Sequence, residues 1–317
     1  MNILVDLINP SRIKPSGFYT KGVSIIADEL VKIYRIGKNI SVPALRGISF
    51  KIGSGEAVSI MGPSGSGKTT LLNIIGGIDK PTSGSIIVEN IKVSELDETM
   101  LEKYRLCCVG YVFQAFNLIP VLSSIENVEL PMIALNVPRD IRIKRANWLL
   151  EQVGLIDRIH HKPYELSGGQ QQRVAIAIAL ANDPPLILAD EPTAELDTEN
   201  ALNIINLLTR LSTDYGKTVI VSTHDPRMAI RTQRIIRLED GRAIGEYKPS
   251  ELISSEIRYS DITSLIKTRL ASMEKEIEEL VDRFRKGFIN HEEFHQKYVK
   301  LKNYIEVLKE MLYSSGY

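Results

Sequence analysis

Short apolar runs that end in polar residues recur along the middle of this chain. They are Val109–Val112, Leu186–Ala189, Thr218–Ser222 and Arg234–Leu238, and segments with helical periodicity lie between them. Apolar runs of this length are typical of strands that are buried on both faces, and strands that alternate with helices favour a mainly parallel sheet. We therefore predict an α/β protein with such a sheet as its core.

Two other regions of the chain have different patterns. Residues 25–60 and 84–90 are rich in Val, Ile and turn residues, which indicates an antiparallel β subdomain. Residues of about 115–168 show polar helical periodicity, interrupted by Pro131, Pro138 and Pro163, and we expect a helical insert there.

After residue 247 the pattern changes to two helical seams. The first seam is Ile262, Ile266, Leu270, Met273, Ile277, Leu280 and Phe284; the second is Phe294, Tyr298, Leu301, Ile305, Leu308 and Leu312. Gly287 separates the seams, and Asn290 with Glu293 resembles a capping box, so an antiparallel helical hairpin is expected. The hairpin either packs its seam internally or on the rest of the chain, or it pairs with a second copy. The first is favoured, because about three heptads do not fix an oligomeric state.

The loop Gly62–Thr69 follows the apolar run Glu56–Met61, which indicates a short buried strand. It reads Gly-Pro-Ser-Gly-Ser-Gly-Lys-Thr and has the spacing of a phosphate-binding loop. Its glycines let backbone N–H groups turn towards phosphate oxygens, and the helix that opens near Lys68 adds the positive end of its dipole. We expect Lys68 to reach the β- and γ-phosphates, Thr69 to coordinate Mg²⁺ and Thr70 to touch the α-phosphate. A glycine turn with an incidental lysine is the weaker alternative.

A second candidate feature is the acidic end of the run Leu186–Ala189. Asp190 and Glu191 follow it, at the point where a buried strand emerges. Beside a phosphate loop, Asp190 is placed to hold Mg²⁺ directly or through water, and Glu191 to orient or deprotonate the attacking water. Without the loop, a solvated pair of carboxylates would be the better interpretation.

A third feature is the sequence Leu166-Ser-Gly-Gly-Gln170, which precedes the apolar periodic stretch Val174–Ala181. It predicts a second helix N-terminus suited to an anion. One chain then has two helix N-termini suited to phosphate but only one nucleotide. Taken alone, the motif is equally well explained as an N-capped helix after a turn.

These motifs, in this order, resemble the ATP-binding subunit of ABC transporters, and more closely the branch of LolD, MacB and FtsE. The similarity covers residues of about 25–246, and the segments nearest to that branch are Asn127–Pro131, Gln170–Ala177 and Leu188–Thr193. The resemblance implies a head-to-tail homodimer that sandwiches two ATP molecules, each between the phosphate loop of one subunit and the signature Leu166–Gln170 of the other. One departure is Ala194-Glu195, where the branch usually has Gly-Asn.

The resemblance also assigns roles to residues that spacing alone does not. Tyr34 fits the aromatic residue that stacks on adenine, provided that residues 35–55 fold back as a β-hairpin; otherwise it is an ordinary strand aromatic. Gln114 fits the glutamine that senses Mg²⁺ and the membrane partner, Glu195–Asp197 the dimer loop, and His224 the γ-phosphate switch.

The expected site residues fall into three groups. The catalytic group is Glu191, His224, Lys68 and Gln114, and the metal ligands are Thr69, Gln114 and Asp190. The residues expected to bind ATP are Tyr34, Gly62, Pro63, Ser64, Gly65, Ser66, Gly67, Lys68, Thr69, Thr70, Ser167, Gly168, Gly169, Gln170 and Asp197.

Composition narrows the class of protein. Lys plus Arg and Asp plus Glu both total 39, and this neutral balance weakens any nucleic-acid interpretation. No stretch approaches the roughly 18 apolar residues of a membrane-spanning helix, so a pore would have to come from a separate multi-span permease. The acid within Met1–Ile8 argues against a secretion signal, and the two cysteines, Cys107 and Cys108, fit a reducing cytoplasm. The cysteines are expected on opposite faces of a strand.

The predicted organisation is an N-terminal extension (1–24), taken as a loose lead-in, an ABC-type P-loop ATPase domain (25–247) and a C-terminal helical hairpin (248–317). The favoured function is an ATPase with ATP and Mg²⁺ as cofactors, which drives a permease from the inner face of the cell membrane. Export, lipoprotein release and mechanotransmission are its possible forms. A soluble ABC-type ATPase in DNA repair, translation or cluster assembly is the alternative.

Overall fold

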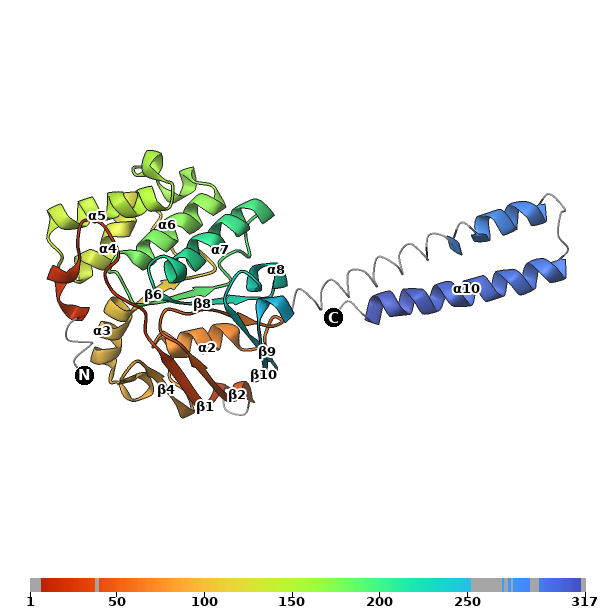
Figure 1. The fold of residues 1–317 in the computed structure, drawn as a ribbon, viewed down its shortest axis with the longest axis horizontal. Helices are drawn as coiled ribbons and strands as arrows, with labels where there is room; N and C mark the ends of the chain where they lie inside the picture. The colour runs from red at the N-terminus through yellow and green to blue at the C-terminus, as the bar shows by residue number, and fades with distance from the viewer. Residues whose placement is uncertain are drawn as a thin grey trace. The chain divides into compact units, whose positions relative to one another are not determined.

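The protein is described by a computed structural model that covers residues 7–37, 40–251, 270, 273–274, 276–285 and 291–314. The chain divides into two compact units, Met1–Pro249 and Ser250–Tyr317. Each unit is described by itself below (Figure 1).

The larger unit is built on a six-stranded sheet in the order β10-β9-β3-β8-β7-β6. Its strands are β3 (Ala57–Met61), β6 (Val109–Val112), β7 (Leu186–Asp190), β8 (Thr218–Thr223), β9 (Arg234–Glu239) and β10 (Arg242–Tyr247). All neighbours are parallel except β9 and β10, and every residue of β7 and β8 is buried. This confirms the mainly parallel core that the apolar runs predicted.

Helices cover both faces of this sheet. Figure 1 shows α2 on one side and α6 and α7 on the other. The helices that pack around the sheet are α2 (Lys68–Ile75), α3 (Glu98–Cys108), α6 (Gly168–Leu180), α7 (Thr198–Thr213) and α8 (Pro226–Ala229). The predicted insert contains α4 (Ser124–Ala134), α5 (Arg139–Gln152) and two short 3₁₀ turns, η3 (Ile156–Arg158) and η4 (Pro163–Glu165). A capping box between Ser123 and Glu126 starts α4.

The second sheet has four antiparallel strands in the order β2-β1-β4-β5. Its strands are β1 (Ile25–Ile36), β2 (Ile40–Ile52), β4 (Ser83–Val88) and β5 (Ile91–Lys92), and a 3₁₀ turn, η2 (Val93–Glu95), follows them. β1 and β2 form the β-hairpin that the interpretation of Tyr34 required, with Tyr34 opposite Val42. Residues 57–60, predicted in this sheet, belong to β3 of the central sheet instead, because they are buried on both faces.

The prediction for the cysteines was wrong in its secondary structure. Cys107 and Cys108 are the last two residues of α3, which passes into β6 at Val109 without an intervening loop. Both are unpaired and buried. Burial raises the pKa of both thiols, that of Cys108 to about 12, so they remain protonated at neutral pH. Buried, protonated thiols are unreactive, which favours a structural role.

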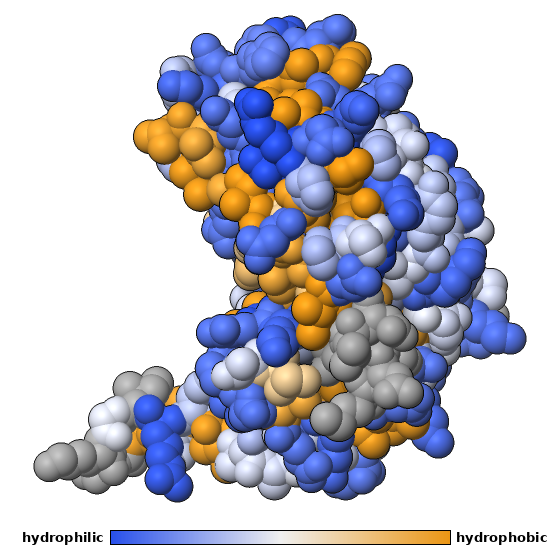
Figure 2. Space-filling view, turned by 90° about the vertical axis from the view of Figure 1, so that its left-hand side faces the viewer, coloured by the Kyte–Doolittle hydropathy of each residue, from blue (hydrophilic) through white to orange (hydrophobic). Residues whose placement is uncertain are grey.

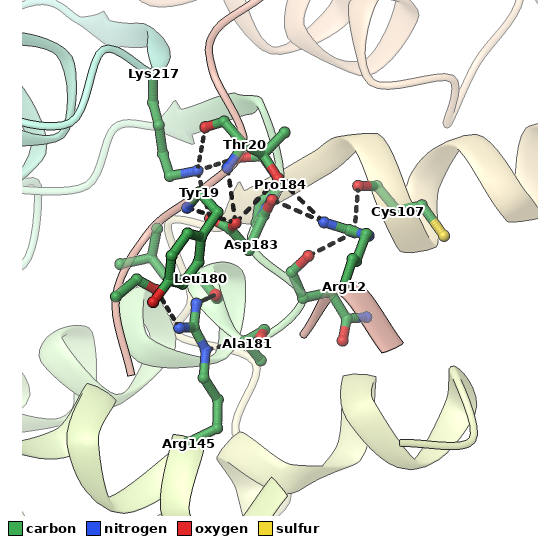
Figure 3. A network of polar contacts seen from close by, with 12 residues as sticks. Arg12, Tyr19, Thr20, Cys107, Arg145, Leu180, Ala181, Asp183, Pro184 and Lys217 are labelled. Atoms are coloured by element: carbon green, nitrogen blue, oxygen red, sulfur yellow. Dashed lines mark hydrogen bonds and ion pairs between the residues drawn. The ribbon is translucent and has the colours of Figure 1, made fainter. Parts of the chain in front are cut away.

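The N-terminal segment is not a loose lead-in where the structure describes it. Residues 7–24 pack against the rest of the larger unit, with Leu7, Ile13 and Val23 buried in its core and a 3₁₀ turn, η1 (Pro10–Arg12), near their start. The Arg12 guanidinium donates to four carbonyl oxygens, those of Leu7, Asp183, Cys107 and Asn182. Figure 3 shows Arg12 reaching towards Cys107 and Asp183.

A buried carboxylate anchors the same segment. Asp183 accepts from the backbone N–H groups of Tyr19 and Thr20 and from the Thr20 hydroxyl, each at 2.9 Å. It also lies 2.7 Å from the ammonium of Lys217, which is fully buried (Figure 3). Burial alone would raise the pKa of Asp183, but Lys217 and the backbone donors hold that pKa below its ordinary value.

The N-terminal segment also joins two parts of the larger unit. Arg145 of α5 donates to the carbonyl oxygens of Gly17, Leu180 and Ala181, and the Phe18 ring packs edge-on against Trp148 and Tyr215. The segment is therefore held between the helical insert and the edge of the core.

The described residues of the smaller unit are all helical: residues 250–251, 270, 273–274 and 276–285, and α10 (His291–Ser314). Leu270, Met273 and Ile305 are buried together, with Ile277 and Leu301 against them, and Phe284 stacks on Phe294. The two predicted seams thus meet inside the hairpin. Ile262, Ile266, Gly287 and Asn290, and the side chains of Glu293, Leu308 and Leu312, lie outside the described residues.

Candidate active site

The phosphate loop connects β3 to α2 as predicted. Gly65 and Gly67 have φ of 78° and 101°, conformations that are costly for other residues. Gly62 is needed for a different reason: a Cβ there would lie 2.1 Å from the Leu238 carbonyl oxygen. The loop is therefore tightly packed against β9, and α2 begins at Lys68 with its N–H groups facing the loop.

A cavity of about 660 Å³ lies over this loop. The predicted site residues that line it are Pro63, Ser64, Gly65, Gly67, Lys68, Thr69, Thr70, Gln114, Glu191 and His224. Gly62 and Ser66 are buried beneath it, and the Ser66 hydroxyl has no hydrogen-bond partner among the described residues. The structure thus gathers residues from four separate segments of the sequence around one polar cavity.

Four lining residues were not predicted. Val42, Pro43 and Ala44 of β2 and Ala194 after the acidic pair complete the wall. The signal for β2 was indirect. Val42 lies opposite Tyr34 and Pro43 opposite Ile33 in the β1–β2 hairpin, so the strand that pairs with Tyr34 reaches the cavity.

Lys68 provides a buried positive charge at the cavity floor. It is 5% exposed, and its ammonium donates to the carbonyl oxygens of Gly62 at 2.9 Å and Pro63 at 3.0 Å. Oε1 of Glu191 lies 3.2 Å from the same nitrogen. A cation held by carbonyls and one carboxylate, at the start of a helix, is suited to a polyanion.

Glu191 lies between Lys68 and His224. Its Oε2 is 2.9 Å from Nδ1 of His224, whose side chain is 63% exposed. The backbone of Glu191 has φ of 45°, an uncommon conformation for a residue with a side chain. Its N–H donates to the hydroxyl of Ser222 at 2.9 Å and to the Ser222 carbonyl oxygen at 3.2 Å, which hold this conformation. The carboxylate is therefore aimed back over the phosphate loop.

Asp190 is the last residue of β7 and is 6% exposed. The hydroxyl of Ser222 on the neighbouring strand donates to its Oδ1 at 2.5 Å. Asp190 does not line the cavity surface itself but lies under it, one residue from Glu191.

Tyr34 stands at the edge of the site. Its hydroxyl donates to Oδ2 of Asp79 at 2.8 Å, and the ammonium of Lys32 lies 4.9 Å from the ring centroid. The ring is partly exposed and is not part of the cavity wall, although Val42 opposite it is.

The signature residues lie elsewhere on the molecule. Ser167 and Gln170 form a capping box at the N-terminus of α6, with the Ser167 hydroxyl accepting from the Gln170 N–H at 3.4 Å. A Cβ on Gly168 would lie 3.7 Å from Leu196 and from Phe116, so the signature packs beside the loop that precedes α7. Asp197 caps α7 by accepting from the Asn200 N–H at 3.0 Å. None of the signature residues lines the cavity over the phosphate loop.

Comparisons with known proteins agree with this arrangement. Residues 45–194 match the sequence profile of a family described as ABC transporter. An uncharacterized ABC transporter ATP-binding protein of Thermotoga maritima is 52% identical over 214 residues, which are 68% of this chain and 91% of that protein. A macrolide export ATP-binding/permease protein, MacB, of Hyphomonas neptunium is 44% identical over 218 residues, which are 69% of this chain but 34% of that longer protein.

Similarity extends to solved structures. One is the dimeric structure of a post-hydrolysis state of an ATP-binding cassette, a Methanocaldococcus jannaschii protein, bound to ADP and Pi. It matches with a TM-score of 0.67 and 48% identity, and the match covers 71% of this chain and 98% of that one.

Proposed function

This chain belongs to the ABC transporter ATP-binding proteins, and we propose that two copies of it hydrolyse ATP at shared sites and drive a separate membrane-spanning permease. The ATPase activity follows from the family and from the site. The observation that carries the residue-level proposal is the convergence of Lys68, Glu191 and His224 over the phosphate loop.

The triphosphate would lie over the loop Gly62–Gly67. Lys68, with its charge buried at the cavity floor, would exchange its contacts with loop carbonyls for the β- and γ-phosphate oxygens. Thr70, the next cavity residue along α2, would meet the α-phosphate. The exposed part of the Tyr34 ring, at the edge of the antiparallel sheet, would stack on the adenine.

The oxygen atoms around the cavity fit Mg²⁺. The Thr69 hydroxyl and the Gln114 amide line the cavity, and Asp190 uses Oδ1 for Ser222, which leaves Oδ2 as the oxygen for a metal ion. Among the described residues no cluster of three His, Cys, Asp or Glu side chains could hold a metal. A hydroxyl, an amide oxygen and a carboxylate are the donors of a Mg²⁺ site that substrate phosphates complete. The ion would neutralise charge on the β- and γ-phosphates.

Glu191 is the proposed general base. It would accept a proton from a water molecule as the water oxygen bonds to the γ-phosphorus and the bond to the β-phosphate oxygen breaks, giving ADP and phosphate. His224, already 2.9 Å from Glu191, would orient the carboxylate and contact the γ-phosphate. Gln114 would report the presence of the metal-bound nucleotide to the helical insert that begins after it.

The requirement for a second copy rests on the position of the signature. In one chain the N-terminus of α6 does not reach the cavity over the phosphate loop. The N-termini of α2 and α6 are therefore two separate candidate phosphate sites. A head-to-tail pair would place Ser167, Gly168, Gly169 and Gln170 of one copy against the γ-phosphate held by the other, with Asp197 nearby. The similar solved cassette is dimeric.

A permease partner is proposed from the helical insert. Hydrophobic side chains reach the surface in patches between polar ones (Figure 2). In the insert the exposed ones include Ile119, Val121, Ile133 and Ile156, and Val121 is 73% exposed. Such side chains suit a protein partner. None of the helices in the described parts of the chain has the length and apolar content to span a membrane. We place the complex on the inner face of the cell membrane, where ATP hydrolysis would drive export, lipoprotein release or mechanotransmission.

The decisive variant is Glu191→Gln. It should keep ATP affinity, accumulate an ATP-dependent dimer in sedimentation experiments and lower turnover about 10²–10⁴-fold. Glu102→Gln, which changes an exposed glutamate of α3 in the same way, should behave as the unsubstituted protein. Unchanged turnover in Glu191→Gln would remove Glu191 from its role.

The partner can be identified with the same variant. Pull-down from detergent-solubilised native membranes with Mg-ATP should recover a multi-span protein. Recovery of soluble or nucleic-acid-associated proteins alone would favour the alternative, a soluble ABC-type ATPase.

A further inference from the structure

The C-terminal hairpin carries a groove that its internal packing does not fill. The groove has a volume of about 410 Å³ and lies between residues 273–283 and α10. Its floor is formed by Met273, Leu280 and Leu301, and Tyr304 at its edge is 54% exposed. An apolar floor with an exposed aromatic side chain beside it is typical of a contact surface.

The two rims of this groove have opposite charges. Glu276 and Glu279 line it from the first helix, and Lys297 and Lys300 line it from α10; all four side chains are exposed. One hairpin therefore presents an acidic edge and a basic edge on the same face.

The two edges lie at the same level along the hairpin. An ion pair between Glu274 and Lys309, at 3.2 Å, marks one level, and the stacking of Phe284 on Phe294, with ring centroids 4.4 Å apart, marks another. Along the sequence, Glu279 is midway between Glu274 and Phe284. Lys300 is close to midway between Phe294 and Lys309. Glu279 is thus about level with Lys300, and Glu276 lies about one helical turn from that level, a distance that a lysine side chain spans. Lys297 lies about one turn to the other side of it.

We propose that this groove binds the same groove of a second copy, so that two hairpins form a four-helix bundle. Two twofold arrangements place groove against groove. In one, each helix meets its own copy, and Glu279 faces Glu279. In the other, the twofold axis runs along the hairpins, and the acidic edge of each copy faces the basic edge of its partner at the same level. Charge selects the second arrangement.

One rim residue does not add to this match. Arg283 lies one turn beyond Glu279, towards the end of the groove near Phe284, where it would approach Lys297 of the partner subunit. Its side chain is exposed, so its charged end can point away into solvent. Glu276, Glu279 and Lys300, which lie nearer the centre, decide the pairing.

A dimer of this kind is independent of ATP. Because the hairpin and the ATPase domain belong to one chain, paired hairpins would keep two ATPase domains at high effective concentration between rounds of hydrolysis. The hairpin dimer goes beyond the proposed function, and its test requires neither nucleotide nor permease. The hairpin dimer and the proposed function can therefore each fail without the other.

The test uses full-length chains in sedimentation velocity experiments without nucleotide. The unsubstituted protein should be a dimer at micromolar concentration. Glu276→Lys with Glu279→Lys makes both edges basic, and Lys297→Glu with Lys300→Glu makes both edges acidic; each should weaken self-association about 100-fold. An equimolar mixture of the two variants should form a heterodimer, because each edge then again faces its opposite.

A heterodimer in the mixture can come only from pairing between copies, because mixing two chains does not restore opposite charges within one hairpin. Glu278→Lys with Lys302→Glu is the control: it changes exposed charges that do not line the groove, and the protein should stay dimeric. Far-ultraviolet circular dichroism checks that the helices persist, and the single substitutions Glu279→Lys and Lys300→Glu replace any double variant that loses them. A monomeric unsubstituted protein, a dimer that survives reversal, or a mixture that stays monomeric would each overturn the proposal.

Discussion

The hydroxyl of Ser222 donates a hydrogen bond to Oδ1 of Asp190 over 2.5 Å. The hydroxyl oxygen of Ser222 also accepts from the backbone N–H of Glu191, which has an uncommon positive φ. One buried side chain thus fixes both acids, the residue expected to hold the metal ion and the expected base.

Ser222→Ala should lower the rate at saturating Mg-ATP about tenfold, because one hydrogen bond to a charged group contributes about 1.5 kcal/mol. The KM for ATP should change little, since Ser222 lies behind the acids and not in the cavity wall. Steady-state phosphate release over a range of ATP concentrations measures both values. Ser222→Thr keeps the hydroxyl and should keep most of the rate; equal losses in both variants would assign Ser222 to packing only.

Lys68→Ala should weaken ATP binding about 10–100-fold, because it removes charge-assisted hydrogen bonds to phosphate. Titration calorimetry measures the dissociation constant directly. Lys51→Ala removes an exposed lysine of β2 and is the matched control. Normal affinity in Lys68→Ala would contradict the phosphate-loop assignment.

Removal of divalent cations with a chelator should abolish ATP hydrolysis, and added Mg²⁺ should restore it, because the ion would neutralise charge on the β- and γ-phosphates. Asp190→Asn should raise the Mg²⁺ concentration needed for half-maximal rate, as one charged ligand becomes neutral. Hydrolysis at full rate in the chelator would exclude Mg²⁺ as the cofactor.

Asp183→Asn should lower the free energy of unfolding by about 3–5 kcal/mol, since it leaves the fully buried ammonium of Lys217 without its counter-ion. Denaturant titrations give this quantity. Asp214→Asn removes a surface pair with Arg210, in which the Asp214 side chain is 45% exposed, and should cost less than about 1 kcal/mol. Similar values for the two variants would show that the buried pair does not hold the N-terminal segment.

The stability difference between the unsubstituted protein and Asp183→Asn should depend on pH. Folding lowers the pKa of Asp183 from its ordinary value of 3.8, so the unfolded chain takes up the proton first as pH falls. The stabilisation is therefore complete above about pH 5 and is lost as the pH falls through 3.8 towards the folded pKa. Denaturant titrations of both proteins at several acidic pH values measure it; a difference that stays constant would be the contrary result.

Sequence patterns located the phosphate loop and the core strands because each is a local feature. Gly62, Gly65 and Gly67 with Lys68 specify a loop conformation within eight residues, and β7 and β8 are continuous apolar runs. The same patterns failed at Cys107 and Cys108, because α3 and β6 share one uninterrupted apolar stretch and no loop residue marks the boundary.

The contacts that depend on distant parts of the chain were not predictable. Nothing near Val42 in the sequence indicates that it faces the phosphate loop; that follows from its register with Tyr34. Likewise Ser222 is an ordinary strand residue until β7 and β8 pair and place it opposite Asp190.

The N-terminal segment has a consequence for the order in which the protein is completed during synthesis. Thr20 leaves the ribosome early, but its partner Asp183 is 163 residues away along the chain, and Lys217 is 197 residues away. Contacts of such long sequence separation form late, because a large loop must close first. The residues translated first are thus among the last to reach their final positions, and until then the ion pair of Asp183 and Lys217 lacks its hydrogen bonds to Tyr19 and Thr20.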